Sequence, residues 1–327
     1  MKTGKLSNAD LNDIVLKKLP ACSSSVTEGP GTGLDCGIMK CKGKMIAVSS
    51  DPVTGAGNHI GKIALHVSCN DIASCGVRPS AVNLVIIIPP SSSEDDLASI
   101  VDEIAVTARD LEVDIIGGHT EVSDAVTRPV LIATAFGYAE SGEIIYSNGA
   151  KSGDSIVMTK YAAIEGTSII ASDFRSILTG SLSEEDLDFA AGLSDQLSVL
   201  REGTICAGSG IVNAMHDVTE GGVLGAAKEM AEASGLGCRI DLRTVKLYPQ
   251  TKAICEHFQI DPYRLISSGS MLVSTPEPDK LILRLESAGI TCSAIGIMVE
   301  KGFEFIGLDG ELNELTVTEA DELYKIR

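Results

Sequence analysis

The chain has 327 residues, more than the roughly 250–300 that a single hydrophobic core usually serves, so we expect two domains. Its 44% hydrophobic and 22% charged residues are typical of a globular protein. The formal net charge of −19 argues against broad binding to nucleic acids or anionic membranes, because both require a basic surface. An anionic substrate would need a bridging cation or backbone amides to hold it, and the acidity also favours solubility.

The cysteines and the apolar runs bear on where the protein works. Nine cysteines are scattered without any Cys-x-x-Cys pair, which indicates buried, reduced thiols. The start of the sequence does not have the pattern of a signal peptide, and no apolar run approaches the ~20 residues of a membrane span. We therefore expect a cytoplasmic protein with no membrane or nucleic-acid partner.

Hydrophobic periodicity in the first half predicts alternating helices and strands. In chain order, these are a helix at 8–19, a strand at 45–50, a helix from about 59 to 76, a strand at 81–88, an amphipathic helix at 97–111, a short strand at 113–116 and a long strand at 130–138. Ser93 and Asp96 predict a capping box before the amphipathic helix. Strand, helix and strand in this order predict a split βαβ unit.

A polar, glycine-containing segment at 147–154 predicts the domain boundary, which gives domains at 1–148 and 149–327. The second half alternates in the same way. It contains predicted strands at 155–159, 271–274 and 292–298 and predicted helices after 163–167 and at 184–200, 223–235 and 278–288. The tail from 316 to 327 is polar and has no recognisable motif.

Asp71 is the first candidate functional residue. It lies one turn beyond Val67 on the apolar face of the helix that begins near His59. A carboxylate there must be desolvated, paired or bound to a cation, because burying a bare charge is costly. Asp51 follows the apolar run at 45–48, so an acid at a strand end and an acid on the next helix could meet at one metal ion.

Two glycine-containing segments carry further acids. The loop at 28–37 contains Asp35, and its glycines would let a ligand approach the backbone closely. The block 216–222 contains Asp217 and ends in Gly221-Gly222 before an apolar helix. A helix that starts at two glycines presents free amides that suit a phosphate.

Structural roles remain open for each of these residues. Asp51 could cap a turn, Asp71 could pair with Lys62 or Arg78, and Asp217 could cap a helix. His119 and His216 could both be structural histidines. The co-occurrence of four acids near glycines favours a magnesium–nucleotide site, since Mg²⁺ is usually bound by one or two carboxylates plus substrate phosphates. These acids are Asp35, Asp51, Asp71 and Asp217.

Five sequence blocks, in this order, resemble those of the aminoimidazole ribonucleotide (AIR) synthetase superfamily. They are Gly33-Leu34-Asp35, Ser50-Asp51, Asn70-Asp71 with Gly76-Val77-Arg78-Pro79, Gly117-Gly118-His119-Thr120, and His216-Asp217-Val218-Thr219-Glu220-Gly221-Gly222. The superfamily includes thiamine-monophosphate kinase, selenophosphate synthetase and the hydrogenase-maturation dehydratase. The likeness covers nearly the whole chain, and the layout is most similar to the hydrogenase expression/formation branch.

The resemblance implies a PurM-like two-domain architecture: an α+β N-terminal domain that dimerises through its sheet, then an α/β C-terminal domain. It implies ATP and Mg²⁺ as cofactors. The implied metal ligands are Asp35, Asp51, Asp71 and Asp217, and the catalytic candidates are Asp71, His119 and Asp217. The implied nucleotide-binding residues are Gly33, Asp35, Asp51, Asn70, Asp71, Gly117, Gly118, His119, Thr120 and Asp217.

The implied activity is that of an ATP-dependent ligase, dehydratase or phosphotransferase. Such an enzyme would use the ATP γ-phosphoryl group to activate or phosphorylate a small-molecule or protein-borne acceptor, and hydrogenase maturation is one process that it would fit. The resemblance does not identify the acceptor.

Three departures from the family pattern favour an alternative function. Leu34 and His119 replace family aspartates, and Cys292 is the last cysteine, whereas the maturation dehydratase ends in a reactive one. The absence of a terminal cysteine argues against the nitrile-forming reaction. The alternative is a catalytically reduced, nucleotide-binding regulatory or scaffold subunit, and a third hypothesis is a structural partner in a maturation complex.

Overall fold

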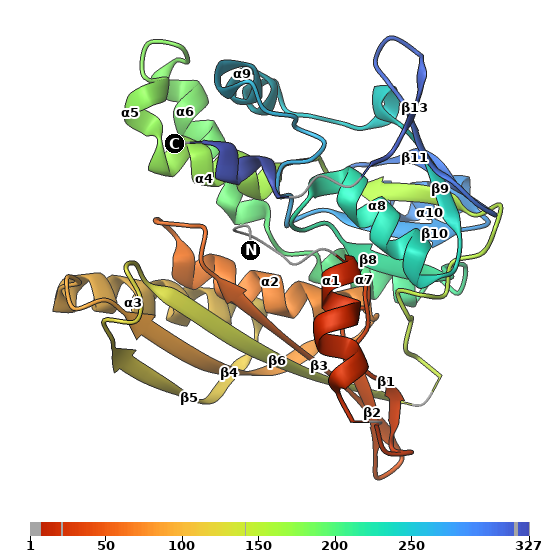
Figure 1. The fold of residues 1–327 in the computed structure, drawn as a ribbon, viewed down its shortest axis with the longest axis horizontal. Helices are drawn as coiled ribbons and strands as arrows, with labels where there is room; N and C mark the ends of the chain where they lie inside the picture. The colour runs from red at the N-terminus through yellow and green to blue at the C-terminus, as the bar shows by residue number, and fades with distance from the viewer. Residues whose placement is uncertain (1–7, 21, 141, 317–319, 327) are drawn as a thin grey trace.

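The computed structural model describes residues 8–20, 22–140, 142–316 and 320–326, which form two units that each contain a β-sheet and helices (Figure 1). The predicted domain limits at residues 1 and 327 lie outside the described residues. The predicted boundary between 148 and 149 lies between the two sheets and stays a prediction. Within the described ranges, no helix is long and apolar enough to span a membrane.

The first unit is a six-stranded sheet in the order β1-β2-β3-β6-β4-β5. Its strands are β1 (Val26–Glu28), β2 (Gly37–Cys41), β3 (Lys44–Val53), β4 (Pro79–Ile88), β5 (Asp114–Val122) and β6 (Val130–Glu140). Neighbours pair antiparallel except β4 and β5, which are parallel. A split βαβ unit is present, but not where the sequence placed it: β4 and β5, the strands on either side of the predicted helix at 97–111, pair directly. Instead β6 lies between β3 and β4, the strands that α2 (Ile60–Ser74) connects.

Helices α2 and α3 (Glu94–Leu111) lie on the same side of this sheet (Figure 1). Almost all of α2 is buried, because it packs on β3 and β6 and also contacts the second unit. The predicted capping box begins α3: Ser93 Oγ accepts the Asp96 amide at 3.1 Å, and the Asp96 carboxylate accepts the Ser93 amide at 2.8 Å. The packing of α2 on the first sheet and against the second unit holds this helix between the two units.

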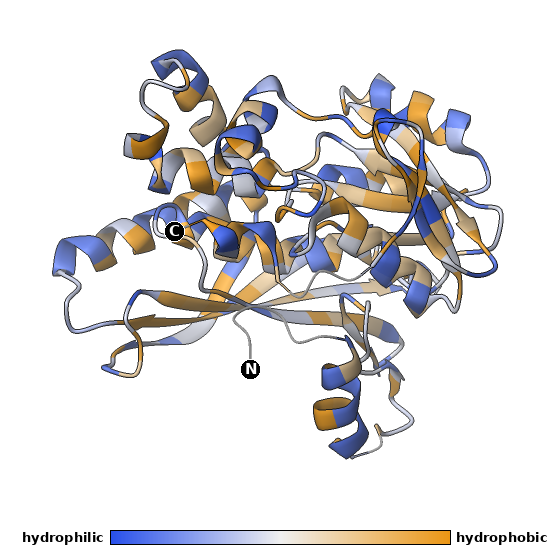
Figure 2. Ribbon diagram, turned by 45° about the horizontal axis from the view of Figure 1, so that its top comes forward, coloured by the Kyte–Doolittle hydropathy of each residue, from blue (hydrophilic) through white to orange (hydrophobic). Residues whose placement is uncertain are grey.

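The second unit is a seven-stranded mixed sheet in the order β13-β12-β9-β11-β7-β10-β8. Its strands are β7 (Ser155–Thr159), β8 (Ala214–Asp217), β9 (Gly237–Asp241), β10 (Met271–Thr275), β11 (Cys292–Val299), β12 (Phe303–Ile306) and β13 (Leu312–Glu314). Its α-helices are α4 (Ile164–Asp173), α5 (Arg175–Leu178), α6 (Glu184–Gly192), α7 (Leu200–Ala207), α8 (Gly222–Ala233), α9 (Pro249–Phe258) and α10 (Pro278–Ser287). Hydrophobic and hydrophilic residues alternate along these elements (Figure 2), as expected where one face of a helix or strand is buried and the other faces water.

One hydrophobic core joins the two units. It includes Ile72 of α2 and Ala133 of β6 from the first unit, together with Ile170 of α4 and Leu265 from the second. Leu323, near the end of the described chain, packs into the same core. Both units therefore frame the space between the sheets, and a cavity lies there.

Three predicted elements differ in the structure. The helix at 8–19 is a mixed segment of α1 (Asn8–Asp10), a π turn (Leu11–Val15) and a 3₁₀ turn (Leu16–Lys18). The helix at 184–200 is interrupted after Gly192, because a 3₁₀ turn and a short loop precede α7. The short strand at 113–116 is wrong in length, since β5 continues to Val122 by pairing with β4.

Candidate functional site

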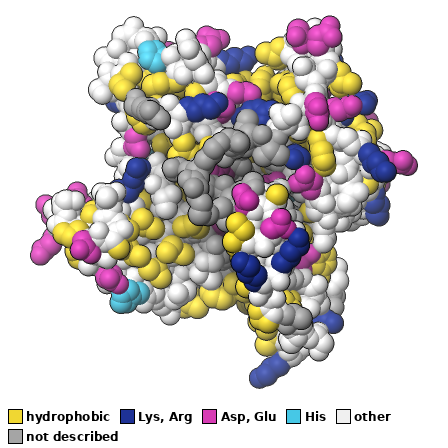
Figure 3. Space-filling view, viewed as in Figure 1, with side chains coloured by type: hydrophobic (Ala, Val, Ile, Leu, Met, Phe, Trp, Pro, Cys, Tyr) yellow, Lys and Arg dark blue, Asp and Glu magenta, His cyan; other side chains and the backbone are white. Residues whose placement is uncertain are grey.

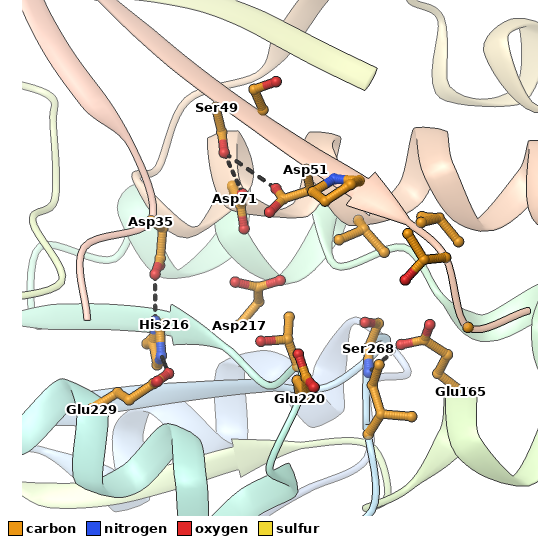
Figure 4. Close-up of a pocket in the computed structure, with 18 of the residues that line it drawn as sticks. Asp35, Ser49, Asp51, Asp71, Glu165, His216, Asp217, Glu220, Glu229 and Ser268 are labelled. Carbon is orange, nitrogen blue, oxygen red and sulfur yellow. Dashed lines mark hydrogen bonds and ion pairs between the residues drawn. The ribbon is translucent and has the colours of Figure 1, made fainter. Parts of the chain in front are cut away.

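A cavity of about 590 Å³ lies between the two units, within the roughly 300–1,000 Å³ that is usual for ligand sites. Its wall includes the end of β3, one face of α2, the loop before β2, the end of β8 and the last described turn (Figure 4). No lysine or arginine is among the described residues that line it. The cavity is therefore acidic, and His216 is its one basic side chain within that described lining.

Asp71 and Asp51 meet as predicted, and Ser49 links them. The Ser49 hydroxyl donates to the Asp71 carboxylate and lies 3.4 Å from Asp51 Oδ2. Asp71 is 8% exposed, and burial, followed by the charges of Asp51 and Asp217, holds its pKa well above its usual value. Crowded carboxylates of this kind need protons or a cation to neutralise them.

The structural alternative of an ion pair at Asp71 is wrong. Lys62 pairs with Asp195 and Arg78 pairs with Glu112, and both pairs lie outside the cavity that Asp71 lines. The buried carboxylate of Asp71 thus has other acids as its charged neighbours.

Asp217 comes from the second unit, at the end of β8. It is 1% exposed, and its Oδ2 has no hydrogen-bond partner among the described residues. Burial and the charge of Asp35 raise its pKa to about 7. Gly221 occupies the N-cap position of α8, so the alternative role of Asp217 as a helix cap is wrong.

His216 connects Asp35 to Glu229. Its Nδ1 bonds to Asp35 Oδ1, and its Nε2 lies 3.4 Å from Glu229 Oε2. Burial alone lowers the pKa of His216, but the two carboxylates outweigh it and hold that pKa well above the usual value. The other oxygen of Asp35 accepts a hydrogen bond from Ser147 Oγ at 3.0 Å. Asp35 is therefore already neutralised and oriented by the protein.

The donor set fits a hard divalent cation. Carboxylate oxygens of Asp35 and Asp217 lie within 4.8 Å of each other, and Asp51 and Asp71 face the same space (Figure 4). Carboxylate oxygens are the ligands that Mg²⁺ prefers. One oxygen of Asp217 has no hydrogen-bond partner among the described residues, and the pKa of Asp71 is raised. Both features are expected of carboxylates that a bound cation would neutralise in place of protons.

Glu165, at the start of α4, lies at the other end of the cavity and was missed from the sequence. It is 3% exposed, and burial raises its pKa to about 7. Its carboxylate accepts the Ser268 amide at 3.3 Å, while the buried Ser268 hydroxyl has no partner among the described residues. This pair places a titratable acid and an unsatisfied hydroxyl at this end of the cavity (Figure 4).

The last described turn contributes Asp321, which was also missed. Its carboxylate accepts the amides of Gly221 at 2.7 Å, Ile266 at 3.2 Å and Leu323 at 2.9 Å. Burial raises its pKa to about 6. The amide of Gly221, which the sequence predicted for a phosphate, is therefore bonded to the protein's own carboxylate.

Of two further residues predicted to bind the nucleotide, Gly33 lines the cavity and Asn70 does not. Gly33 lines the cavity with a φ of +70°, and a Cβ there would lie 2.6 Å from the Glu229 carbonyl oxygen. Asn70 does not line the cavity. It bonds to the Leu197 carbonyl at 2.8 Å and to the Val199 amide at 3.0 Å, which ties α2 to the second unit.

The Gly117–Thr120 segment lies away from the acids. Predicted as a phosphate-side loop, it forms part of edge strand β5, where every residue is exposed. None of its residues lines the cavity. Gly118 allows this pairing because a Cβ there would lie 1.9 Å from the Leu84 carbonyl oxygen.

The fold and the site together define a two-domain protein with a PurM-like architecture and an acidic cavity between its domains. Models of the AIR synthase related protein family match the chain, the N-terminal domain over residues 33–139 and the C-terminal domain over residues 151–309. The chain belongs to this family, and that prediction is confirmed.

Similar proteins fall in the hydrogenase-maturation branch, as predicted. A Methanocaldococcus jannaschii protein named for hydrogenase expression and formation is 28% identical over 90% of this chain and 88% of its own length. Carbamoyl dehydratase HypE of Rhizobium leguminosarum is 28% identical over 78% of this chain and 72% of its own. A crystal structure of hydrogenase maturation protein HypE in complex with ATP has a TM-score of 0.73 at 20% identity, over 98% of this chain and 97% of that one.

Proposed function

We propose that the chain binds Mg–ATP in the acidic cavity and uses the γ-phosphoryl group to activate or phosphorylate an acceptor. The observation that carries this proposal is the charge pattern: buried acids crowd a cavity whose described lining contains no lysine or arginine. A triphosphate can enter such a cavity only if a metal ion neutralises the negative charges of both the phosphates and the carboxylates. The ATP complex of HypE supports the choice of nucleotide.

The metal would lie among Asp51, Asp71 and Asp217. Magnesium, when bound, supplies charge neutralisation at the phosphates. Ser49 orients the Asp71 carboxylate, and His216 holds the Asp35 carboxylate in place. Glu165 lies where it could take or hold a proton of the acceptor, since its raised pKa suits such exchange near neutral pH.

We further propose that the enzyme is a cytoplasmic homodimer. Ile132 and Phe136 lie on the face of β6 opposite Ala133 and Ala135, which are buried under α2, and hydrophobic side chains are visible at the surface over the first sheet (Figure 3). A partner across this face could bring its exposed Gly117–Thr120 strand to the nucleotide, which this chain's own strand does not reach. All nine cysteines are free, as suits a reducing compartment.

The variant Asp71→Asn tests the site. We expect at least a hundredfold loss of ATP affinity in the presence of Mg²⁺, measured by calorimetry, because the variant removes a central metal ligand while keeping the size of the side chain. Asp195→Asn is the control, since Asp195 is exposed and lies outside the cavity. Unchanged ATP affinity in Asp71→Asn would contradict the assignment.

A nucleotide-binding regulatory subunit is the second candidate. The observation that favours it is His119, which stands where family members outside the selenophosphate branch carry an aspartate and is 67% exposed on β5. Release of ADP or phosphate from ATP and Mg²⁺ separates the two candidates, since a regulatory subunit would bind ATP and return it intact.

A further inference from the structure

A second cavity, of about 810 Å³, opens on another face of α2. It lies between the first unit and the segment that leads into α7, and it shares no lining residue with the acidic cavity. Its described lining consists of Lys62, His66, Arg78, Asp110, Leu111, Glu112, Asp195, Ser198, Leu200, Arg201, Thr204 and Ile205. Unlike the acidic cavity, it contains three strongly basic side chains.

His66 is the buried polar group of this cavity. It is 7% exposed, and its Nδ1 is enclosed by protein with no hydrogen-bond partner among the described residues. Burial, followed by the charges of Lys62 and Lys160, lowers its pKa to about 3. The imidazole is therefore neutral and carries one proton. We place that proton on Nε2, because a buried N–H without an acceptor costs more than a buried unprotonated nitrogen. Nε2–H is then the donor left for a ligand.

Basic groups surround this imidazole at the protected end of the cavity. The Lys62 side chain is 21% exposed and that of Lys160, just behind the lining, is 17% exposed. The partner of Lys62, Asp195, is 79% exposed, and Glu112 (71% exposed) and Asp110 are also exposed, whereas Lys160 is paired at 3.0 Å with Glu202, which is only 3% exposed. Charges in water are screened more than sheltered ones, so the positive charge of Lys62 is only partly offset by Asp195, while that of Lys160 is offset by Glu202.

Arg201 completes the donor set at the rim. Its guanidinium donates to the Ala288 carbonyl at 2.9 Å and has no carboxylate partner among the described residues. A guanidinium has five donors, so most of its hydrogen-bonding capacity is left for a ligand. The ion pair of Lys62 with the exposed Asp195 is of the weak surface type that a bound anion can displace.

We propose that this cavity binds a phosphate group, either as the free anion or as the monoester of a small molecule. His66 Nε2–H, the Lys62 ammonium and the Arg201 guanidinium would contact the phosphate oxygens. The remaining volume, bordered by Leu200 and Ile205, leaves room for the organic part of a monoester. The site is separate from the nucleotide cavity and does not depend on the function proposed for it.

Histidine side-chain ¹⁵N NMR tests this proposal, because the chain has five histidines and their signals can be assigned individually. Inorganic phosphate and glycerol 3-phosphate are titrated into the full chain without nucleotide. We expect the His66 signals to shift saturably while those of His257, which lines neither cavity, stay in place. Tighter binding of glycerol 3-phosphate would identify a monoester site, and equal binding would identify a free phosphate site.

Two variants give the matched comparison. Arg201→Gln should raise the apparent dissociation constant at least tenfold. Arg284→Gln should leave it within twofold, since Arg284 is likewise exposed and bonded to one carbonyl, that of Gly208 at 3.3 Å, but lies outside the cavity. Asp217→Asn, in the acidic cavity, should leave the His66 response intact. An unmoved His66, an equal response in Arg201→Gln or a response lost in Asp217→Asn would overturn the proposal.

Discussion

Glu165 shows how burial sets the behaviour of one residue in this site. Its carboxyl group lies almost out of contact with water, near Asp321 and Glu220, and its carboxylate accepts one amide hydrogen bond, from Ser268. The folded state therefore favours the protonated form more strongly than the unfolded chain does. The pKa rises from 4.5 to about 7, which makes Glu165 a source of pH-dependent stability.

The variant Glu165→Gln should change how stability depends on pH. Because the folded pKa is raised, the favourable contribution of neutral Glu165 is complete below pH 4.5 and is lost as the pH rises through 7. From pH 5 to pH 8, the native chain should lose about 2–3 kcal/mol of its free energy of unfolding relative to Glu165→Gln, because only the native chain carries the titrating group. Urea unfolding at both values measures it.

Glu185→Gln is the control for that measurement, because Glu185 is exposed in the first turn of α6. Its difference from the native chain should be the same at both pH values. A flat difference in Glu165→Gln as well would contradict the burial argument.

At the scale of elements, α2 depends on a close approach to α3. Gly61, in the first turn of α2, would carry a Cβ 2.6 Å from the Ile100 carbonyl oxygen and 3.1 Å from Glu103 Cβ. A methyl group does not fit there unless one helix moves. The glycine is therefore required by packing and not by its backbone angles.

Gly61→Ala should destabilise the fold by about 1–3 kcal/mol, the usual cost of overpacking. Gly192→Ala at the end of α6 is the matched control, since a Cβ there meets nothing within 4 Å. That control should be neutral or slightly stabilising, because alanine favours helix. Thermal unfolding of both variants checks the contrast, and equal stabilities would show that α2 and α3 can separate freely.

The first sheet makes a prediction about assembly. The outer side of β6 presents Ile132, Thr134 and Phe136, half-buried in the single chain, and no described helix of this unit packs there. Phe136→Glu should convert a dimer into a monomer in sedimentation equilibrium. Val101→Glu, on the exposed side of α3, should leave the dimer intact. A native chain that sediments as a monomer would rule out this interface.

Some residues of the site could be predicted from the sequence and others could not. Asp51 and Asp71 were predicted to meet because β3 and α2 follow each other in the chain, so periodicity alone places both acids at one junction. Glu165 and Asp321 were not predicted, because they come from segments more than ninety residues from either acid, and their burial arises from the contact of two units. The glycines of β5 were predicted as a loop because parallel pairing with β4 is a tertiary effect.

At the scale of the whole molecule, the acidic cavity is built by both units, so a ligand in it should stabilise the entire fold. ATP with Mg²⁺ at a hundred times the dissociation constant should add about 2.7 kcal/mol to the free energy of unfolding. Differential scanning calorimetry should show a rise in the unfolding temperature that EDTA abolishes. A shift that persists in EDTA would mean that the nucleotide binds without a metal.

The bond from Asp321 to the start of α8 has a consequence for the choice of ligand. A helix N-terminus attracts anions, and here the protein supplies an internal one that takes the amide of Gly221. An incoming phosphate would have to displace a carboxylate that also holds Ile266 and Leu323. The chain thus opposes direct capture of bare anions at this helix. Free inorganic phosphate should accordingly be a poor inhibitor of nucleotide binding.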